Sequence, residues 1–269
     1  MISYVFPGQG AQFEGMGLKM YENSAIAREY FQKANEILGF DISEIMFRGS
    51  AEDLKQTRVT QPALFLHAVI KVKMQGADFH PDAVAGHSLG EFSALVAARA
   101  MSFEDGLKLV SARAVAMQKA CDKEPGTMAA ILGLQDDKVE RICSDIDEIV
   151  VAANYNCPGQ LVISGEYKAV ELACEKMKEA GAKRTLVLPV SVPSHCSLMK
   201  SAAGKFKTYI EFVDLKAGNV KVIHNVDADY AGDIKDIKAK LVEQLHMPVL
   251  WASSVNKMKE SGVEKLIEV

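Results

Sequence analysis

Apolar residues recur along this chain at two spacings, and the spacings predict strands and helices in alternation. The pattern of residues 1–6 predicts an apolar strand, and the segment 7–10, Pro-Gly-Gln-Gly, ends that strand in a loop. Apolar positions three and four residues apart predict helices over 24–38, from about 60 to 72, and over 103–121. The first part of the chain therefore has the strand-then-helix order of an α/β domain.

The ends of these predicted helices carry the residue types that helix ends favour. Gly39 follows the first helix as a stop signal, and Pro62 falls in the predicted first turn of the second. Residues 102–105, Ser-Phe-Glu-Asp, resemble a capping box, which makes the helix that follows the clearest in the chain.

From Thr127 the order of elements changes. A strand, a helix, two strands, a helix and a strand follow in turn, over 128–134, 136–145, 149–153, 161–164, 167–179 and 185–190. This β-α-β-β-α-β order is the ferredoxin-like unit. After it, a strand over 222–226, a helix over 234–245 and a last helix–strand pair ending at 263–269 are predicted. We therefore expect a large α/β-hydrolase-like domain, 1–126 and 194–269, with residues 127–193 inserted as a ferredoxin-like small domain.

Composition and charge exclude several classes of protein. The 269 residues are 49% hydrophobic and 25% charged, with a net charge of −4, which is ordinary for a globular chain. No basic run suggests a nucleic-acid groove, and no stretch of about 18 apolar residues suggests a membrane span, so we expect a cytoplasmic protein with neither partner. The five cysteines are odd in number and widely spaced, which predicts free, mostly buried thiols and no metal site.

The pentapeptide Gly86-His87-Ser88-Leu89-Gly90 marks the candidate nucleophile. It stands between an apolar run ending at 83–85 and a helix-like stretch beginning at Glu91, which is the context of a nucleophile elbow. Small residues two before and two after Ser88 permit the sharp turn, and the N–H of Leu89 would point at the same spot as the serine hydroxyl. A bare G-x-S-x-G is common in a chain with 19 glycines. The choice of Ser88 as candidate nucleophile therefore rests on the predicted strand before the motif and the predicted helix after it.

A serine nucleophile needs a base, and the candidates are the six histidines. Their places in the predicted elements rank them as candidate bases: 67, 80, 87, 195, 224 and 246. His195 lies where the small domain rejoins the large one, a place where clefts form. His224, on a predicted strand of the large domain, stays open as a competitor. His87 adjoins the serine, but neighbours in a sharp turn point apart, so a structural role is favoured for it.

Two further segments carry ambiguous signals. The glycines of the loop 7–10 would let a backbone N–H approach a substrate oxygen, although the loop could equally be a plain turn. Arg113 borders the apolar stripe of its helix. It either extends to solvent or, if the helix lines a cleft, grips a substrate carboxylate with two hydrogen bonds.

These motifs together resemble the malonyl-CoA:acyl carrier protein transacylases of bacterial fatty-acid synthesis, over essentially the whole chain. The matching segments, in order, are Phe6-Pro7-Gly8-Gln9-Gly10-Ala11-Gln12, Thr60-Gln61-Pro62-Ala63, Gly86-His87-Ser88-Leu89-Gly90-Glu91, Arg113, Asn154-Tyr155-Asn156-Cys157-Pro158-Gly159-Gln160, Val192-Pro193-Ser194-His195 and Gln244. The ordered set is far more specific than any single motif in it.

The resemblance implies a two-step transfer from malonyl-CoA to acyl carrier protein by a cytoplasmic, monomeric enzyme without a bound cofactor. In it Ser88 is the nucleophile, His195 the base, and the N–H groups of Gln9 and Leu89 the oxyanion hole. Arg113 would bind the malonyl carboxylate, and the other substrate-site residues would be Gln61, Gln244, Asn156 and His87. The base would be oriented by a backbone carbonyl near residue 244 rather than by a third triad member such as Asp227.

Some features depart from the family pattern, and some rival functions stay open. The family usually continues past 266–269 into a Gly-Pro-Gly turn and a final helix, so this chain is either truncated or shortened. Ser194 could admit some methylmalonyl, and Cys157 replaces an expected serine without evident effect. The rivals are a serine hydrolase that hands the acyl group to water, an acyltransferase that loads a polyketide synthase, and a scaffold that only binds carrier protein.

Overall fold

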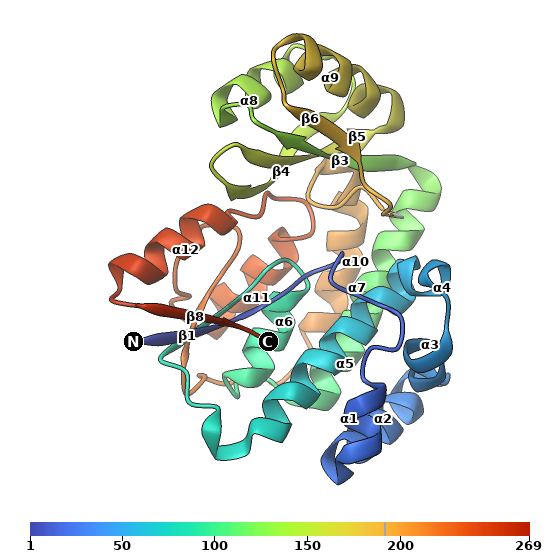
Figure 1. Ribbon diagram of the computed structural model, residues 1–269, viewed down its shortest axis with the longest axis vertical. Coiled ribbons are helices and arrows are strands. Elements are labelled where there is room, and N and C mark those ends of the chain that lie inside the picture. The colour runs from blue at the N-terminus through green and yellow to red at the C-terminus, as the bar shows by residue number, and fades with distance from the viewer. Residues whose placement is uncertain (191) are drawn as a thin grey trace.

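A four-stranded parallel sheet forms the centre of the larger part of the molecule. The computed structural model describes residues 1–190 and 192–269 (Figure 1). In the large sheet the strand order is β7-β2-β1-β8, and each neighbouring pair is parallel. The bounds are β1 (Ile2–Phe6), β2 (Ala83–Gly86), β7 (Lys221–Ile223) and β8 (Lys265–Glu268). Because successive side chains of a strand point to opposite faces, each strand contributes residues to both sides of this sheet.

Helices cover both faces of the large sheet. On one face Tyr4, Phe6 and Val84 join the main core with helices α5 (Thr57–Gln75), α6 (Gly90–Ala97), α7 (Phe103–Lys123) and α10 (Lys200–Ile210). On the other face Val5 and Ala85 pack with Met258 of α12 (Trp251–Glu260). This is the layered arrangement of an α/β domain. The other helical segments of this larger part are α1 (Leu18–Asn23), α2 (Ala25–Leu38), α3 (Ile42–Arg48), α4 (Ala51–Lys55), α11 (Ile234–Glu243), η1 (Gly76–Asp78) and η2 (Ser197–Met199).

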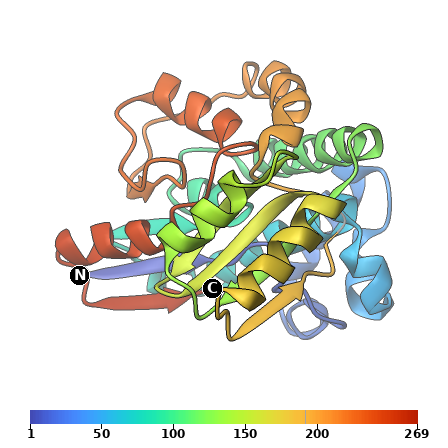
Figure 2. The ribbon, with the colours of Figure 1, turned by 90° about the horizontal axis from the view of Figure 1, so that it is seen from above.

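A second, antiparallel sheet lies beside the first and is built from the middle of the chain. Its order is β4-β5-β3-β6, with β3 (Gly126–Leu132), β4 (Val150–Cys157), β5 (Gln160–Glu166) and β6 (Arg184–Val187). Figure 2 shows α8 (Asp136–Ser144) and α9 (Tyr167–Glu179) side by side on one face of this sheet. They share a core of their own with the sheet, including Ile131, Ile163 and Met177. The predicted fold class, a large α/β domain with a small ferredoxin-like unit, is confirmed.

Most predicted elements lie where the sequence pattern placed them. Helix α2 begins after Ser24, whose side chain accepts a hydrogen bond from the N–H of Ala27, and it ends at Gly39 with a φ of 73°. Helix α7 begins after Ser102, whose side chain accepts from the N–H of Asp105. The exact boundaries of the small domain at 126/127 and 193/194 stay a prediction.

Several predicted boundaries were wrong. Strand β3 begins and ends two residues before its predicted bounds, and β6 stops at Val187, three residues before the predicted end. Helix α5 begins at Thr57 rather than near 60, because the carbonyl of Gln56 already accepts the N–H groups of Val59 and Thr60, so Pro62 lies beyond the first turn. Strand β4 continues to Cys157, since this predicted loop segment pairs with β5 through two bulges. Strand β7 stops at Ile223, three residues before the predicted end.

No helix in the part of the chain that the structure describes is long and apolar enough to span a membrane. Within residues 1–190 and 192–269, no three His, Cys, Asp or Glu side chains gather as a metal-binding group would require. Four of the five cysteines, Cys121, Cys143, Cys174 and Cys196, are buried, as predicted, and Cys157 is exposed.

Candidate active site

Ser88 stands at the turn between β2 and α6, and its backbone is in the left-handed region with a φ of 51°. The two glycines of the motif make this turn possible. A Cβ on Gly86 would lie 1.9 Å from the carbonyl carbon of Gly90, and one on Gly90 would lie 2.1 Å from the backbone oxygen of Phe6. Because backbone atoms cannot give way at such distances, only glycine fits either position. The predicted sharp turn between strand and helix is present, and the nucleophilic role of Ser88 stays a prediction.

His195 is the histidine that reaches the serine. Its Nε2 lies 2.8 Å from the Ser88 hydroxyl oxygen, and its Nδ1 lies 2.7 Å from the backbone oxygen of Gln244. With Nδ1 protonated and donating to that carbonyl, Nε2 presents a lone pair to the serine hydroxyl. Asp227 instead pairs with Lys240 at 2.8 Å, and among the described residues the partner of Nδ1 is the Gln244 carbonyl and not a carboxylate. The competitor His224 lies elsewhere, against Glu91.

Burial sets the protonation state of this pair. His195 is 2% exposed, and desolvation, helped by the nearby Arg113 cation, lowers the pKa of His195 to about 3. The imidazole is therefore neutral at physiological pH and can accept the serine proton. Its backbone adopts a φ of 63°, and its N–H donates to the carbonyl of Leu245, which fixes the segment after the small sheet.

Arg113 is the largest fully buried side chain and points at the same serine. Its Nη2 donates to the Ser88 hydroxyl oxygen and to Oε1 of Gln244, both at 3.0 Å, and its Nη1 donates to Oε1 of Gln61 at 2.8 Å. Its Nε has no hydrogen-bond partner among the described residues. Burial lowers the pKa of Arg113 to about 10, which leaves the guanidinium charged at neutral pH. Of the two alternatives for Arg113, the structure therefore shows the side chain that points into the cleft and not the one that extends to solvent.

Two polar residues, Asn225 after β7 and Glu91 in α6, hold the elbow, and sequence reasoning missed both roles. Asn225 accepts the N–H of Ser88 on its Oδ1 at 2.6 Å and donates from Nδ2 to the carbonyl of Gly86 at 2.7 Å. Glu91, in the first turn of α6, is fully buried and accepts hydrogen bonds from His224, Asn225 and Gln244. A charged residue directly after the elbow, in a stretch otherwise apolar, was the only sequence signal.

Most of the predicted site residues line one small cavity between the two sheets. Its lining includes Gln9, Gln61, His87, Ser88, Leu89, Arg113 and His195, with Met128 and Asn154 from the small sheet. Gln244 is fully buried behind Arg113 and is not part of this lining, so its predicted contact with substrate stays a prediction.

A wider cavity adjoins the first and shares Gln9, His87 and Asn154 with it. The inner cavity, which Ser88 lines, measures about 60 Å³, and the outer one measures about 520 Å³. His87 is tied to the small sheet here, because its Nε2 lies 2.9 Å from Oδ1 of Asn156. The structural role favoured for His87 agrees with this contact.

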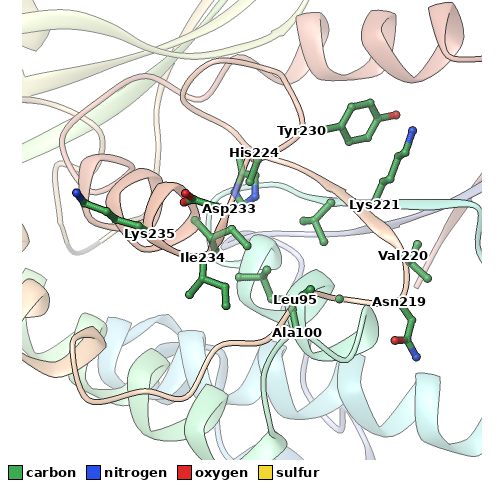
Figure 3. Close-up of a pocket in the computed structure, with 16 residues that line it drawn as sticks. Leu95, Ala100, Asn219, Val220, Lys221, His224, Tyr230, Asp233, Ile234 and Lys235 are labelled. Atoms are coloured by element: carbon green, nitrogen blue, oxygen red, sulfur yellow. The ribbon is translucent and has the colours of Figure 1, made fainter.

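A third cavity lies behind the elbow rather than in front of it. Figure 3 shows its wall, with Leu95, Val220 and Ile234 around it and His224 at its inner end. None of the predicted site residues lines this cavity. It is therefore separate from the space in which Ser88 and His195 meet.

Comparisons with known proteins find one family over nearly the whole chain. The family model described as "Acyl transferase domain" matches residues 3–269. The chain is 45% identical to a malonyl CoA-acyl carrier protein transacylase from Bacillus subtilis, over 100% of this chain and 86% of that one.

Solved structures show the same fold. An acyl carrier protein S-malonyltransferase from Vibrio cholerae is similar with a TM-score of 0.94 and 44% identity, covering 99% of this chain and 89% of that one. A malonyl-transacylase in complex with its type II polyketide synthase acyl carrier protein is similar with a TM-score of 0.96 and 39% identity, covering 99% and 88%.

Proposed function

Because this chain belongs to the acyl transferase domain family, we propose that it moves a malonyl group from malonyl-CoA to the phosphopantetheine thiol of an acyl carrier protein. One observation carries the choice of acyl group. Arg113 is a buried cation within hydrogen-bond distance of the nucleophile, and within the described residues it forms no salt bridge. A carboxylate at the far end of the acyl chain supplies the missing partner. Relatives named as malonyl transacylases support the same choice.

In the first half-reaction Ser88 takes the malonyl group. Nε2 of His195 accepts the hydroxyl proton as Oγ attacks the thioester carbonyl, and the tetrahedral oxyanion forms. The N–H groups of Leu89 and Gln9 are the proposed donors to that oxyanion, since both residues line the cavity beside the serine. The carbon–sulfur bond then breaks, and the imidazolium gives its proton to the leaving thiolate of coenzyme A.

In the second half-reaction the same groups act in reverse order. The thiol of the carrier protein's phosphopantetheine enters through the outer cavity, and the neutral imidazole of His195 accepts its proton. The thiolate attacks the malonyl-Ser88 ester, and the proton returns to Oγ as the ester bond breaks. The carbonyl of Gln244 steadies the imidazolium in both halves by accepting from Nδ1, which is the role a carboxylate plays in a triad.

The rival functions differ in what accepts the acyl group or in whether one forms at all. A hydrolase would pass it to water, and a scaffold would form no acyl-serine. The solved complex of a relative contains a type II polyketide synthase carrier, so either kind of carrier, fatty-acid or polyketide, fits the proposal. A monomeric state and a cytoplasmic location stay predictions.

Substitution of Arg113 tests the proposed substrate. Each charged hydrogen bond to a buried guanidinium contributes about 1.5 to 3 kcal/mol, so Arg113→Ala should lower kcat/KM for malonyl-CoA by about a hundredfold or more. Acetyl-CoA has no carboxylate, and its use should fall much less or rise. The measurement is transfer to holo acyl carrier protein with each donor. An equal loss on both donors would contradict the assignment of Arg113 to the carboxylate.

A further inference from the structure

Glu91 is a buried carboxylate that the proposed mechanism leaves without a role. It lies in the first turn of α6, 0% exposed, three residues after Ser88. Its Oε1 faces Nδ1 of His224 at 2.5 Å. Its Oε2 accepts two hydrogen bonds, from Nε2 of Gln244 at 2.7 Å and from the N–H of Asn225 at 3.1 Å. Two of these three partners lead back to the catalytic groups.

The first partner, Gln244, fixes one acceptor for Arg113. The Gln244 amide donates from Nε2 to Glu91 and to the carbonyl of Ser88, and its Oε1 accepts from Nη2 of Arg113. If the amide were reversed, its NH₂ group would face the guanidinium, donor against donor, and its oxygen would face the carboxylate. Glu91 and the Ser88 carbonyl therefore determine that the oxygen points to Arg113.

The second partner, Asn225, fixes the elbow. Glu91 accepts the N–H of Asn225, and the Asn225 side chain spans Gly86 and Ser88 by two hydrogen bonds. A shift of Asn225 would release the strained turn at Ser88. Glu91 thus reaches both Arg113 and Ser88 through one intermediate residue each.

We propose that Glu91 is a positioning residue that sets the preference for a carboxylated acyl group, by holding the Gln244 amide with its oxygen toward Arg113. The inference rests on the proposed function, because it concerns how Arg113 selects malonyl over an uncharged acyl group. Glu91 itself does not line the cavity in which the acyl group is transferred. Its effect on substrate is therefore indirect.

His224 supports the carboxylate from outside the site. Figure 3 places His224 at the inner end of the third cavity, the one behind the elbow. The Nε2 of His224 has no hydrogen-bond partner among the described residues. Within residues 1–190 and 192–269, the hydrogen bond of its ring is therefore the one to Glu91. Replacing His224 with leucine removes that contact and leaves Gln244 and Asn225 unchanged in sequence.

The test compares Glu91→Ala with Glu91→Gln in the full chain. The measured quantity is the ratio of kcat/KM for malonyl-CoA to kcat/KM for acetyl-CoA, which does not depend on the fraction of enzyme that is folded. Glu91→Ala removes one of the two acceptors of the Gln244 amide. If the amide oxygen then leaves Arg113, the misplaced guanidinium should cost malonyl-CoA, and not acetyl-CoA, about tenfold or more, so the ratio should fall by that factor. Glu91→Gln keeps an oxygen for Gln244 and should retain more of the ratio.

Controls separate this inference from stability and from the proposed function. Phe31→Leu, in the buried core of α2, should lower stability and leave the ratio unchanged. If Glu91→Ala does not fold, His224→Leu replaces it and should lower the ratio in the same direction. A ratio within about twofold of wild type in Glu91→Ala, or in its replacement, overturns the role of Glu91. A wild-type enzyme with no preference for malonyl-CoA overturns the proposed function instead.

Discussion

At the scale of single residues, local motifs predicted the groups that we propose touch substrate, but not the groups that hold them in place. Ser88 and Leu89 could be assigned from five consecutive residues, because the elbow is a local structure. His195 could only be favoured over His224, since the choice depends on which ring lies near Ser88 in space. Glu91 and His224 are 133 residues apart in the chain, and no local pattern indicates that they meet. The second layer of the site therefore needed the structure.

The buried state of His195 has a measurable effect on stability. In the folded protein burial lowers the pKa of His195 to about 3, from an ordinary value of 6.5. Between these values the unfolded chain binds the proton and the folded protein does not, so stability is lost as the pH falls below about 6.5. From pH 7 to pH 5 this one group should cost about 2 kcal/mol of unfolding free energy.

Urea unfolding at the two pH values measures this cost. The loss of stability between pH 7 and pH 5 should be about 2 kcal/mol smaller in His195→Gln than in wild type, because glutamine does not titrate. An equal loss in both proteins would show that His195 is not held neutral by burial. Each protein is compared with itself at the two pH values, so the effect of the substitution on packing, which is the same at both, cancels.

At the scale of elements, the sequence predicted helices better than strand ends. Helices α2 and α7 carry their own caps, Ser24 and Ser102, and their starts were predicted correctly. Strand β4 was predicted too short, because its last residues are held by pairing with β5 and not by a pattern of their own. The short helices α1, α3 and α4 were not predicted, since five to seven residues carry too little periodicity to detect. The longer helix α10 was not predicted either.

Glycine substitutions test the contact between the elbow and β1. In Gly90→Ala the new Cβ would meet the backbone oxygen of Phe6, so β1 or α6 must move. We expect a lower Tm and no malonyl transfer. Gly204, in α10, is a matched control, because a Cβ there meets nothing within 4 Å, and Gly204→Ala should add about 0.5 to 1 kcal/mol of stability. Normal activity and Tm in Gly90→Ala would contradict the description of the turn.

At the scale of the whole molecule, the order of elements was enough to predict two sheets but not the space between them. The β-α-β-β-α-β order indicated the small sheet, and Figure 1 shows it lying across from the large one. The cleft depends on contacts between distant segments, such as His87 with Asn156, 69 residues apart. Its small inner cavity and wide outer cavity fit a short acyl group at Ser88 and a long arm outside.

Intact mass spectrometry tests the central claim, transfer of malonyl through Ser88. The protein is mixed with malonyl-CoA, then with holo acyl carrier protein, beside Ser88→Ala. We expect one malonyl adduct that is absent in Ser88→Ala and that moves to the carrier when the carrier is added. An adduct lost to water at the same rate with or without carrier would contradict the transferase and indicate a hydrolase, and no adduct on wild type would contradict the acyl-serine itself.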